Sequence, residues 1–100
     1  MGMELKVTFS GREPPGWPAV AELLARHGGP VQMRMIDGEL AFPDEAPPDG
    51  WRELRVAHGG AMVTIRREPG AVVLVAWGNA DEAQRRLWDA LAEAFARSAS

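Results

Sequence analysis

The amino-acid sequence predicts an α+β fold with one mainly antiparallel sheet, the element order β-α-β-β-β-β-β-α and both helices packed on one face. Three observations lead to this prediction. Residues 3–9 alternate polar and apolar side chains, as a half-buried strand does. Residues 31–77 contain short apolar runs that are separated by two-residue turn signals and by one longer connection over residues 43–50. Residues 79–97 repeat apolar side chains at helical spacing. An antiparallel sheet covered on one face is the economical architecture for this series of elements.

The composition is that of a single globular domain over residues 1–100, with 46% apolar and 25% charged residues. No apolar run approaches the roughly 20 residues that span a bilayer, and residues 3–9 lack the basic and apolar blocks of a signal peptide. We therefore expect a cytoplasmic protein that does not bind a membrane. One interpretation of Met1 and Gly2 is a remnant of cloning. Residues 98–100 are expected to form a frayed tail.

Residue types that are absent or rare narrow the range of functions. Cysteine is absent, which excludes disulfides, Cys-ligated zinc, iron–sulfur clusters and thiol nucleophiles. The net charge of −3 argues against nucleic acid as a partner, because duplex binding needs a basic footprint. Lys6 is the only lysine beside ten arginines, a usage associated with GC-rich bacterial genomes. We expect a bacterial protein that carries no cofactor.

The first strand and the first helix are separated by a Pro/Gly loop over residues 10–16. In residues 3–9 the apolar side chains point to one face and the polar ones to the other. Pro18 suits the first turn of a helix, where its missing N–H costs nothing. Gly28 and Gly29 end this helix, and Pro30 prevents its continuation. The expected buried face of the helix is Val20, Leu23, Leu24 and His27.

Residues 31–42 are predicted to form a hairpin around Asp37-Gly38, a strong two-residue turn signal. The opposite pairs are then Ile36–Glu39, Met35–Leu40 and Met33–Phe42. The last two pairs place four apolar side chains on one face, so the turn and the side-chain pattern favour the same register. Residues 43–50 follow as an acidic, proline-rich connection that is unsuited to a central strand.

Residues 52–57 are open to two interpretations. As a helix capped by Asp49, they place Trp51, Leu54 and His58 on one face. As a strand, they pair with the next strand across a Gly59-Gly60 turn. We favour the strand because that turn creates two apolar pairs and one opposite-charge pair at once. These pairs are Val56–Val63, Leu54–Ile65 and Glu53–Arg66.

Residues 61–67 and 72–77 form the next predicted hairpin, around Pro69-Gly70, whose register stays open because Pro-Gly favours a type II turn. Residues 72–77 are apolar on both faces, so this strand is expected to be central or covered.

The last helix is predicted to begin after Gly78. Asn79 is a good N-cap residue, and Glu82 three residues later makes the pattern close to a capping box. Its expected buried stripe is Ala80, Ala83, Leu87, Trp88, Leu91, Ala94 and Phe95. Its expected ion pairs are Asp81–Arg85, Glu82–Arg86 and Glu93–Arg97.

The element order, with the last helix covering a curved sheet, resembles a reduced helix-grip or TATA-box-binding-protein-like arrangement. The resemblance is one of element order only, and no motif carries residues over from a family.

Two parts of the chain share a short pattern. A Pro-Pro segment that ends in Trp and is followed by His-Gly-Gly occurs in residues 14–29 and again in residues 47–60. Duplication is one interpretation. The other is that a helix end and a hairpin select the same glycines for different reasons.

The sequence contains no arrangement of residues that indicates catalysis. His27 and His58 are the only histidines, and a metal site would need both together with a carboxylate, so we expect no metal and no catalytic residue. Trp17 and Trp51 follow Pro/Gly loops and suit either a loop anchor or an exposed aromatic in a binding site. The candidate residues for contact with a ligand or partner are Trp17, Trp51, His58, Met62, Arg34, Arg55 and Arg66. The three arginines are expected on the sheet face away from the core, which is alternatively a plain solvated face.

Three hypotheses about function follow. The leading one is a non-catalytic module that binds a protein partner or itself, most simply as a homodimer. The alternative is a small-molecule-binding protein with a cleft between the sheet and the C-terminal helix, lined by Trp51, Trp88 and Met62. The second alternative is a small enzyme that uses His58 with acidic residues. The sequence leaves the identity of the ligand and the pathway open.

Overall fold

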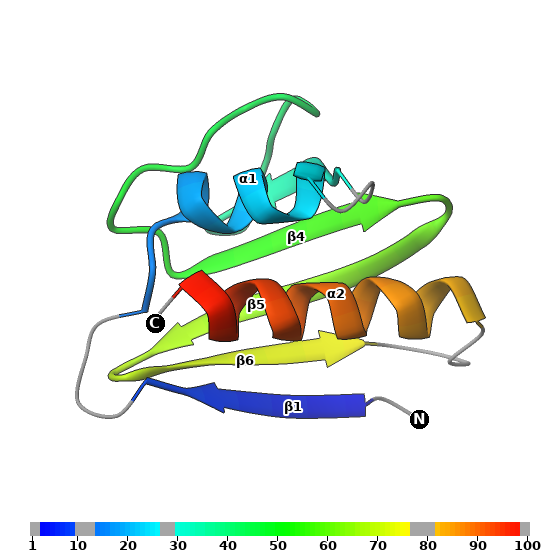
Figure 1. The fold of residues 1–100 in the computed structure, drawn as a ribbon. Coiled ribbons are helices and arrows are strands. Elements are labelled where there is room, and N and C mark those ends of the chain that lie inside the picture. The colour runs from blue at the N-terminus through cyan, green and yellow to red at the C-terminus, as the bar shows by residue number, and fades with distance from the viewer. Residues whose placement is uncertain (1–2, 10–13, 27–29, 77–81, 99–100) are drawn as a thin grey trace.

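The computed structural model describes residues 3–9, 14–26, 30–76 and 82–98. They form two layers, a six-stranded sheet and two helices that lie on one of its faces (Figure 1). The predicted α+β class, antiparallel sheet and element order are confirmed. The predictions for His27, Trp77 and residues 79–81 concern residues outside the described ranges.

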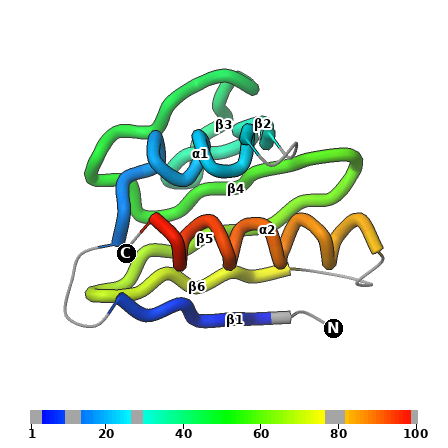
Figure 2. Tube along the Cα trace, in the orientation of Figure 1, coloured from blue at the N-terminus to red at the C-terminus, as the bar shows by residue number. Residues whose placement is uncertain are grey.

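The helices are α1 (Trp17–Arg26) and α2 (Glu82–Ser98). The strands are β1 (Met3–Thr8), β2 (Gln32–Ile36), β3 (Glu39–Leu40), β4 (Glu53–His58), β5 (Ala61–Glu68) and β6 (Ala71–Ala76). Their order across the sheet is β1-β6-β5-β4-β2-β3, and all neighbours are antiparallel. β1 therefore forms one edge of the sheet, and β2 and β3 lie at the other (Figure 2).

The registers of the two central hairpins are now fixed. β4 is a strand, and its pairing with β5 is the predicted one: Val56–Val63, Leu54–Ile65 and Glu53–Arg66. In the β5–β6 hairpin Glu68 lies opposite Ala71, so Pro69-Gly70 is a two-residue loop. Gly70 has a φ of +68°, a conformation that glycine adopts without strain.

The β2–β3 hairpin differs from its prediction because β2 contains a bulge. Met33 lies opposite Val56 and Met35 opposite Arg55, so one extra residue, Arg34, is inserted in β2 relative to β4. A bulge reverses the alternation of side chains. Met33 is consequently buried on the helix-covered face, whereas Met35 shares the open face with Arg55.

The four apolar side chains expected on one face of this hairpin therefore do not share a face, because Met33 and Met35 point to opposite sides of the sheet. The Met35–Leu40 and Ile36–Glu39 pairs are as predicted, but β3 ends at Leu40, and the Met33–Phe42 pair is wrong. Instead, the Met33 backbone N–H donates to the carbonyl of Pro43 at 2.9 Å. Leu40 is 90% exposed and Phe42 74% exposed, so neither contributes to the core.

Helix α2 buries a stripe that matches the prediction except at its first turn. Ala83 is exposed, and the buried residue there is Gln84. Its side-chain amide accepts a hydrogen bond from the Met62 N–H and donates one to the Met62 carbonyl, which satisfies both polar groups of a buried amide. The remaining stripe is Leu87, Trp88, Leu91, Ala94 and Phe95, as expected. Glu82–Arg86 and Glu93–Arg97 are ion pairs; Asp81, the partner expected for Arg85, lies outside the described residues.

The core lies between the sheet and the two helices. α2 packs across β5, β6 and β1, and α1 packs beside α2. Trp17 at the start of α1 contacts Phe95 of α2, with ring centroids 6.5 Å apart. Large apolar side chains buried in this way stabilise the fold by about 1.5–3 kcal/mol each. Neither α1 nor α2 of the described chain has the length and apolar character that crossing a bilayer requires.

The entry into β4 is anchored by Trp51, whose side chain is fully buried. The guanidinium carbon of Arg67 lies 4.3 Å from the centroid of the Trp51 ring, a cation–π arrangement. Arg67 Nη1 also donates to the carbonyl of Asp49 at 2.7 Å, and its backbone N–H donates to the carbonyl of Arg52 at 2.8 Å. The indole N–H of Trp51 and Nε of Arg67 are buried without an acceptor in the described structure. Arg67 therefore joins the 47–52 loop to β5 mainly through two contacts of its guanidinium group: the cation–π contact with Trp51 and the hydrogen bond to the Asp49 carbonyl.

Replacement of Arg67 by methionine tests this anchor. We expect Arg67→Met to lower the free energy of unfolding by roughly 2 kcal/mol, because a partly desolvated cation–π contact and a charge-assisted hydrogen bond are lost. Urea unfolding at neutral pH measures the change. The matched control is Arg66→Met, at the next position and on the opposite face, where an exposed ion pair with Glu53 at 3.4 Å contributes less than about 1 kcal/mol. Equal losses in the two variants would contradict the anchoring role.

The turn between β2 and β3 is tied to β4 by the carboxylate of Asp37. Asp37 and Gly38 have φ values of +51° and +84°, as a two-residue hairpin turn of the I′ type requires. Asp37 Oδ1 accepts hydrogen bonds from the backbone N–H groups of Arg52 at 2.7 Å and Glu53 at 3.0 Å. The hydrogen bond from Glu53, then that from Arg52, and more weakly the positive charges of Arg52 and Arg67, hold the pKa of Asp37 below its ordinary value of 3.8.

The lowered pKa of Asp37 makes the stability of the fold depend on pH in one direction. The ionised carboxylate stabilises the folded state fully above the ordinary pKa of 3.8, and this contribution is lost as the pH falls through the lower folded-state value. Asp37→Asn keeps the tolerance of a positive φ but removes the charge. We expect the variant to be less stable than the wild type at pH 7, with the difference shrinking below pH 4 in urea titrations. A difference that stays constant down to pH 2 would contradict this account.

Candidate binding pocket

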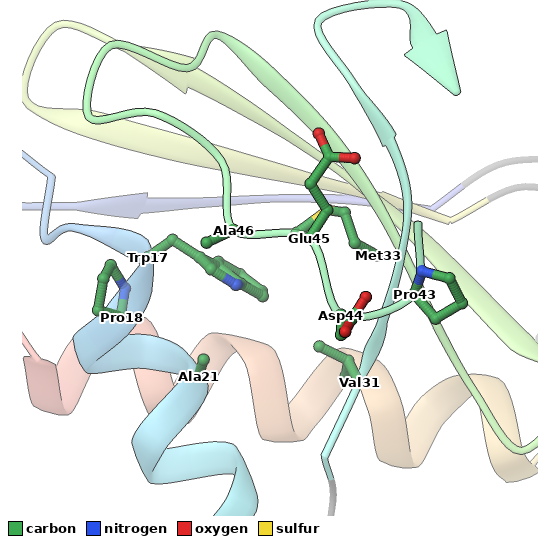
Figure 3. Close-up of a pocket in the computed structure, with 9 residues that line it drawn as sticks. All are labelled: Trp17, Pro18, Ala21, Val31, Met33, Pro43, Asp44, Glu45 and Ala46. Atoms are coloured by element: carbon green, nitrogen blue, oxygen red, sulfur yellow. The ribbon is translucent and has the colours of Figure 1, made fainter. Parts of the chain in front are cut away.

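A surface pocket opens beside the first turn of α1 and is lined by Trp17, Pro18, Ala21, Val31, Met33, Pro43, Asp44, Glu45 and Ala46. We call it the Trp17 pocket. Its volume is about 260 Å³. Figure 3 shows that its side chains come from three segments: the start of α1, the chain leading through β2, and the 43–46 loop. Trp17 and Met33 are buried beneath it, while the loop residues are exposed at its rim.

The local sequence explains why these segments meet. Pro18 occupies the first turn of α1, which places Trp17 at the helix start, where its ring packs against Phe95. The bulge in β2 leaves Met33 on the covered face, below the pocket. The N–H of Met33 donates to the Pro43 carbonyl, which fixes the 43–46 loop against β2.

The loop that forms the rim is closed by its own hydrogen bonds. Glu45 N–H donates to the Phe42 carbonyl at 3.0 Å, and the Glu45 carboxylate accepts from the Phe42 N–H at 3.2 Å. The Glu45 side chain is thus engaged in holding the turn. Asp44 is exposed, and no hydrogen bond or ion pair involves its carboxylate among the described residues. The rim therefore presents two negative charges to an incoming base: the Asp44 carboxylate, and the Glu45 carboxylate, which stays charged while one of its oxygens accepts a backbone hydrogen bond.

The two tryptophans singled out in the sequence have different environments. Trp17 is 6% exposed and lines the pocket. Trp51 is fully buried beneath Arg67 and acts as a loop anchor. Trp88 is also buried, whereas Met62 is 44% exposed and lies on the opposite face of the sheet from the helices. Trp51, Trp88 and Met62 therefore do not line a common cleft between the sheet and α2.

His58 is exposed at the end of β4, and its Nδ1 lies 2.7 Å from the carbonyl oxygen of Pro30. Because a carbonyl only accepts, Nδ1 carries the proton and donates it in this contact. The hydrogen bond ties the start of the β2 segment to the β4–β5 hairpin. Among the described residues no three His, Cys, Asp or Glu side chains are grouped as a metal site would need.

Arg55 and Arg66 lie on the open face of the sheet, as expected, with Thr64 opposite Arg55 and Glu53 opposite Arg66. Arg34 is the bulged residue of β2 and is exposed. The hollow on this face that Arg55 helps to line has a volume of only about 40 Å³, too small for an organic ligand. On the same face the 3.2 Å Lys6–Glu68 ion pair spans β6, where Val73 and Val75 are buried. This arrangement is that of a polar sheet face.

Most of the pocket cannot be predicted from the sequence. Of its nine lining residues only Trp17 was a candidate, because the others are ordinary apolar, proline or acidic residues. The acidic, proline-rich character of residues 43–50 was the available signal. This character is typical of a connecting segment, and the position of the 43–46 loop beside α1 depends on contacts between residues that are distant in the sequence.

Comparisons with protein-family models, with curated proteins and with solved structures found no match. No functional residue is therefore carried over from another protein. The candidate site rests on the geometry of the Trp17 pocket and the charge of its rim.

Proposed function

We propose that the protein is a non-catalytic binding module that takes an apolar side chain of a partner protein into the Trp17 pocket. The observation that carries this proposal is the pocket itself, a mainly apolar hollow over Trp17 and Met33 that opens to the surface. Pockets that receive an apolar side chain of the partner are typical of the central contacts of protein interfaces.

The size of the pocket favours a side chain over a free small molecule. Pockets for drug-sized ligands usually measure about 300–1,000 Å³ and enclose most of the ligand. The Trp17 pocket, at about 260 Å³, lies just under the lower limit of that range and is open to the surface. It suits one large apolar side chain, with the rest of the partner lying across the rim.

The charge of the rim favours a basic residue next to that apolar side chain. Asp44 is exposed and close to the opening, and the chain as a whole carries a net charge of −3. A lysine or arginine of the partner therefore meets an attractive field both at long range and at the rim. The expected recognition element is a short segment with an aromatic or aliphatic residue beside a base.

Filling the pocket tests the proposal directly. Selection from a displayed library of random heptapeptides is expected to enrich sequences with an apolar residue near a lysine or arginine. Ala21→Met places a larger side chain in the pocket and should weaken the selected peptides at least tenfold in fluorescence anisotropy. The matched control is Ala19→Met, on the same helix and exposed away from the lining residues, which should bind like the wild type. Failure to enrich any peptide, or binding that Ala21→Met leaves intact, would contradict the proposal.

Reversing the rim charge tests the second part of the recognition. Asp44→Lys is expected to weaken peptides that contain a base by roughly three- to tenfold, since a favourable rim charge becomes a repulsive one. The same variant should bind better than the wild type to peptides in which the base is replaced by glutamate. Asp89→Lys, on the exposed side of α2, makes the same charge change away from the pocket. Equal effects of the two variants would show that only net charge matters.

A further inference from the structure

The β1 edge of the sheet is unpartnered over the full length of the strand. β1 pairs with β6 on one side, and no described element lies on its other side (Figure 1). It offers six residues, Met3–Thr8, whereas β3 at the opposite edge has two. A straight, unpaired edge strand is a template for pairing with another strand.

The outward backbone groups of β1 can be identified from its pairing with β6. Phe9 N–H donates to the Gly70 carbonyl at 2.8 Å, and the register continues with Thr8 opposite Ala71. In an antiparallel ladder only every second residue bonds to the neighbouring strand. The odd-numbered residues of β1 therefore bond to β6. The N–H and C=O groups of Glu4, Lys6 and Thr8 point outward, where a new strand would bind.

Charge selects one register for the pairing of β1 with a second copy of itself. A two-fold axis at Leu5 places Glu4 opposite Lys6 of the second copy and Lys6 opposite Glu4. Both are residues whose backbone groups point outward, so each opposite pair exchanges two hydrogen bonds. An axis at Lys6 or at Glu4 instead places like charges opposite each other, which is destabilising. An edge lysine ordinarily opposes pairing, but in this register its charge is matched.

The apolar face of the strand fits the same register. Leu5 lies on the helix-covered side, opposite Leu74, yet it is 38% exposed because β1 is the edge strand and no described element lies beyond it. A two-fold axis at Leu5 places this side chain against Leu5 of the second copy. Pairing thus buries one of the few large apolar side chains that the described fold leaves exposed.

We propose that the protein forms a symmetric homodimer by antiparallel pairing of β1 with β1 of a second copy, centred on Leu5. The two sheets then join into one continuous sheet of twelve strands, twice the six of one chain. The contact is isologous, because each copy contributes the same strand. The proposed dimer contact is separate from the Trp17 pocket. The pocket is lined in part by β2, which lies toward the opposite edge of the sheet from β1.

Charge reversal at Glu4 and Lys6 tests the proposal by sedimentation equilibrium of the full chain. Wild-type protein is expected to dimerise reversibly. Glu4→Lys and Lys6→Glu each turn two attractive cross-strand pairs into repulsive ones, so each should raise the dissociation constant about tenfold or more. The double variant E4K/K6E restores opposite charges and should return the constant to within about threefold of the wild type. A mixture of the two single variants should form heterodimers more tightly than either forms homodimers.

The control is Glu39→Lys, which makes the same charge change on β3, at the opposite edge. It should leave the dissociation constant unchanged. The proposal is overturned if the wild-type chain stays monomeric at about 1 mM, or if a dimer responds equally to Glu4→Lys and Glu39→Lys. Because Lys6→Glu also removes the exposed Lys6–Glu68 ion pair, the Glu4→Lys variant and the rescue by the double variant decide the outcome.

Discussion

The covering of one face of the sheet by α2, which packs across β5, β6 and β1, is the interaction on which the rest of the structure depends. Leu54, Ile65 and Leu74 come from β4, β5 and β6 and are fully buried together with Leu91 and Phe95 of α2. Each such side chain contributes about 1.5–3 kcal/mol on burial. No described element covers the other face of the sheet, where the Lys6–Glu68 ion pair spans the apolar residues of β6. The helix layer therefore defines which face of every strand is interior.

The position of α2 in turn decides where a partner can bind. α1 packs on α2 through the Trp17–Phe95 contact, so the start of α1 is held in place by the core. The 43–46 loop is fixed from the other side by Met33, and the end of the same connection by Trp51 and Arg67. The Trp17 pocket lies where these constraints meet. A pocket with anchored walls suits recognition of a partner because little conformational freedom is lost on binding.

The two edges of the sheet differ in a way that matters for assembly. The β2–β3 edge is irregular, because the bulge at Arg34 interrupts the alternation and β3 is short. Bulges and short strands at an edge oppose further pairing. β1 has neither feature, and its charges are arranged as a self-complementary pair about Leu5. The chain therefore presents different surfaces at its two edges, one suited to a side-chain contact and one to strand pairing.

The sequence by itself determined the order of the elements and the pairing of β4 with β5. Alternation gave the faces of β1, the Gly59-Gly60 turn gave the register of β4 with β5, and helical spacing gave nearly all of the buried stripe of α2. These features depend on residues close together in the chain, where turn chemistry and side-chain period act directly.

Only the tertiary structure decided the features that join distant segments. The pairing of β1 with β6, the bulge at Arg34, the burial of Gln84 in place of Ala83 and the stacking of Arg67 on Trp51 are of this kind. A bulge or a buried amide is stable only when particular partners face it. Those partners lie 18 to 25 residues away in the sequence for β2 with β4, and 22 residues away for Gln84 with Met62. The Trp17 pocket has the same origin, because it is formed by three segments whose meeting no local pattern encodes.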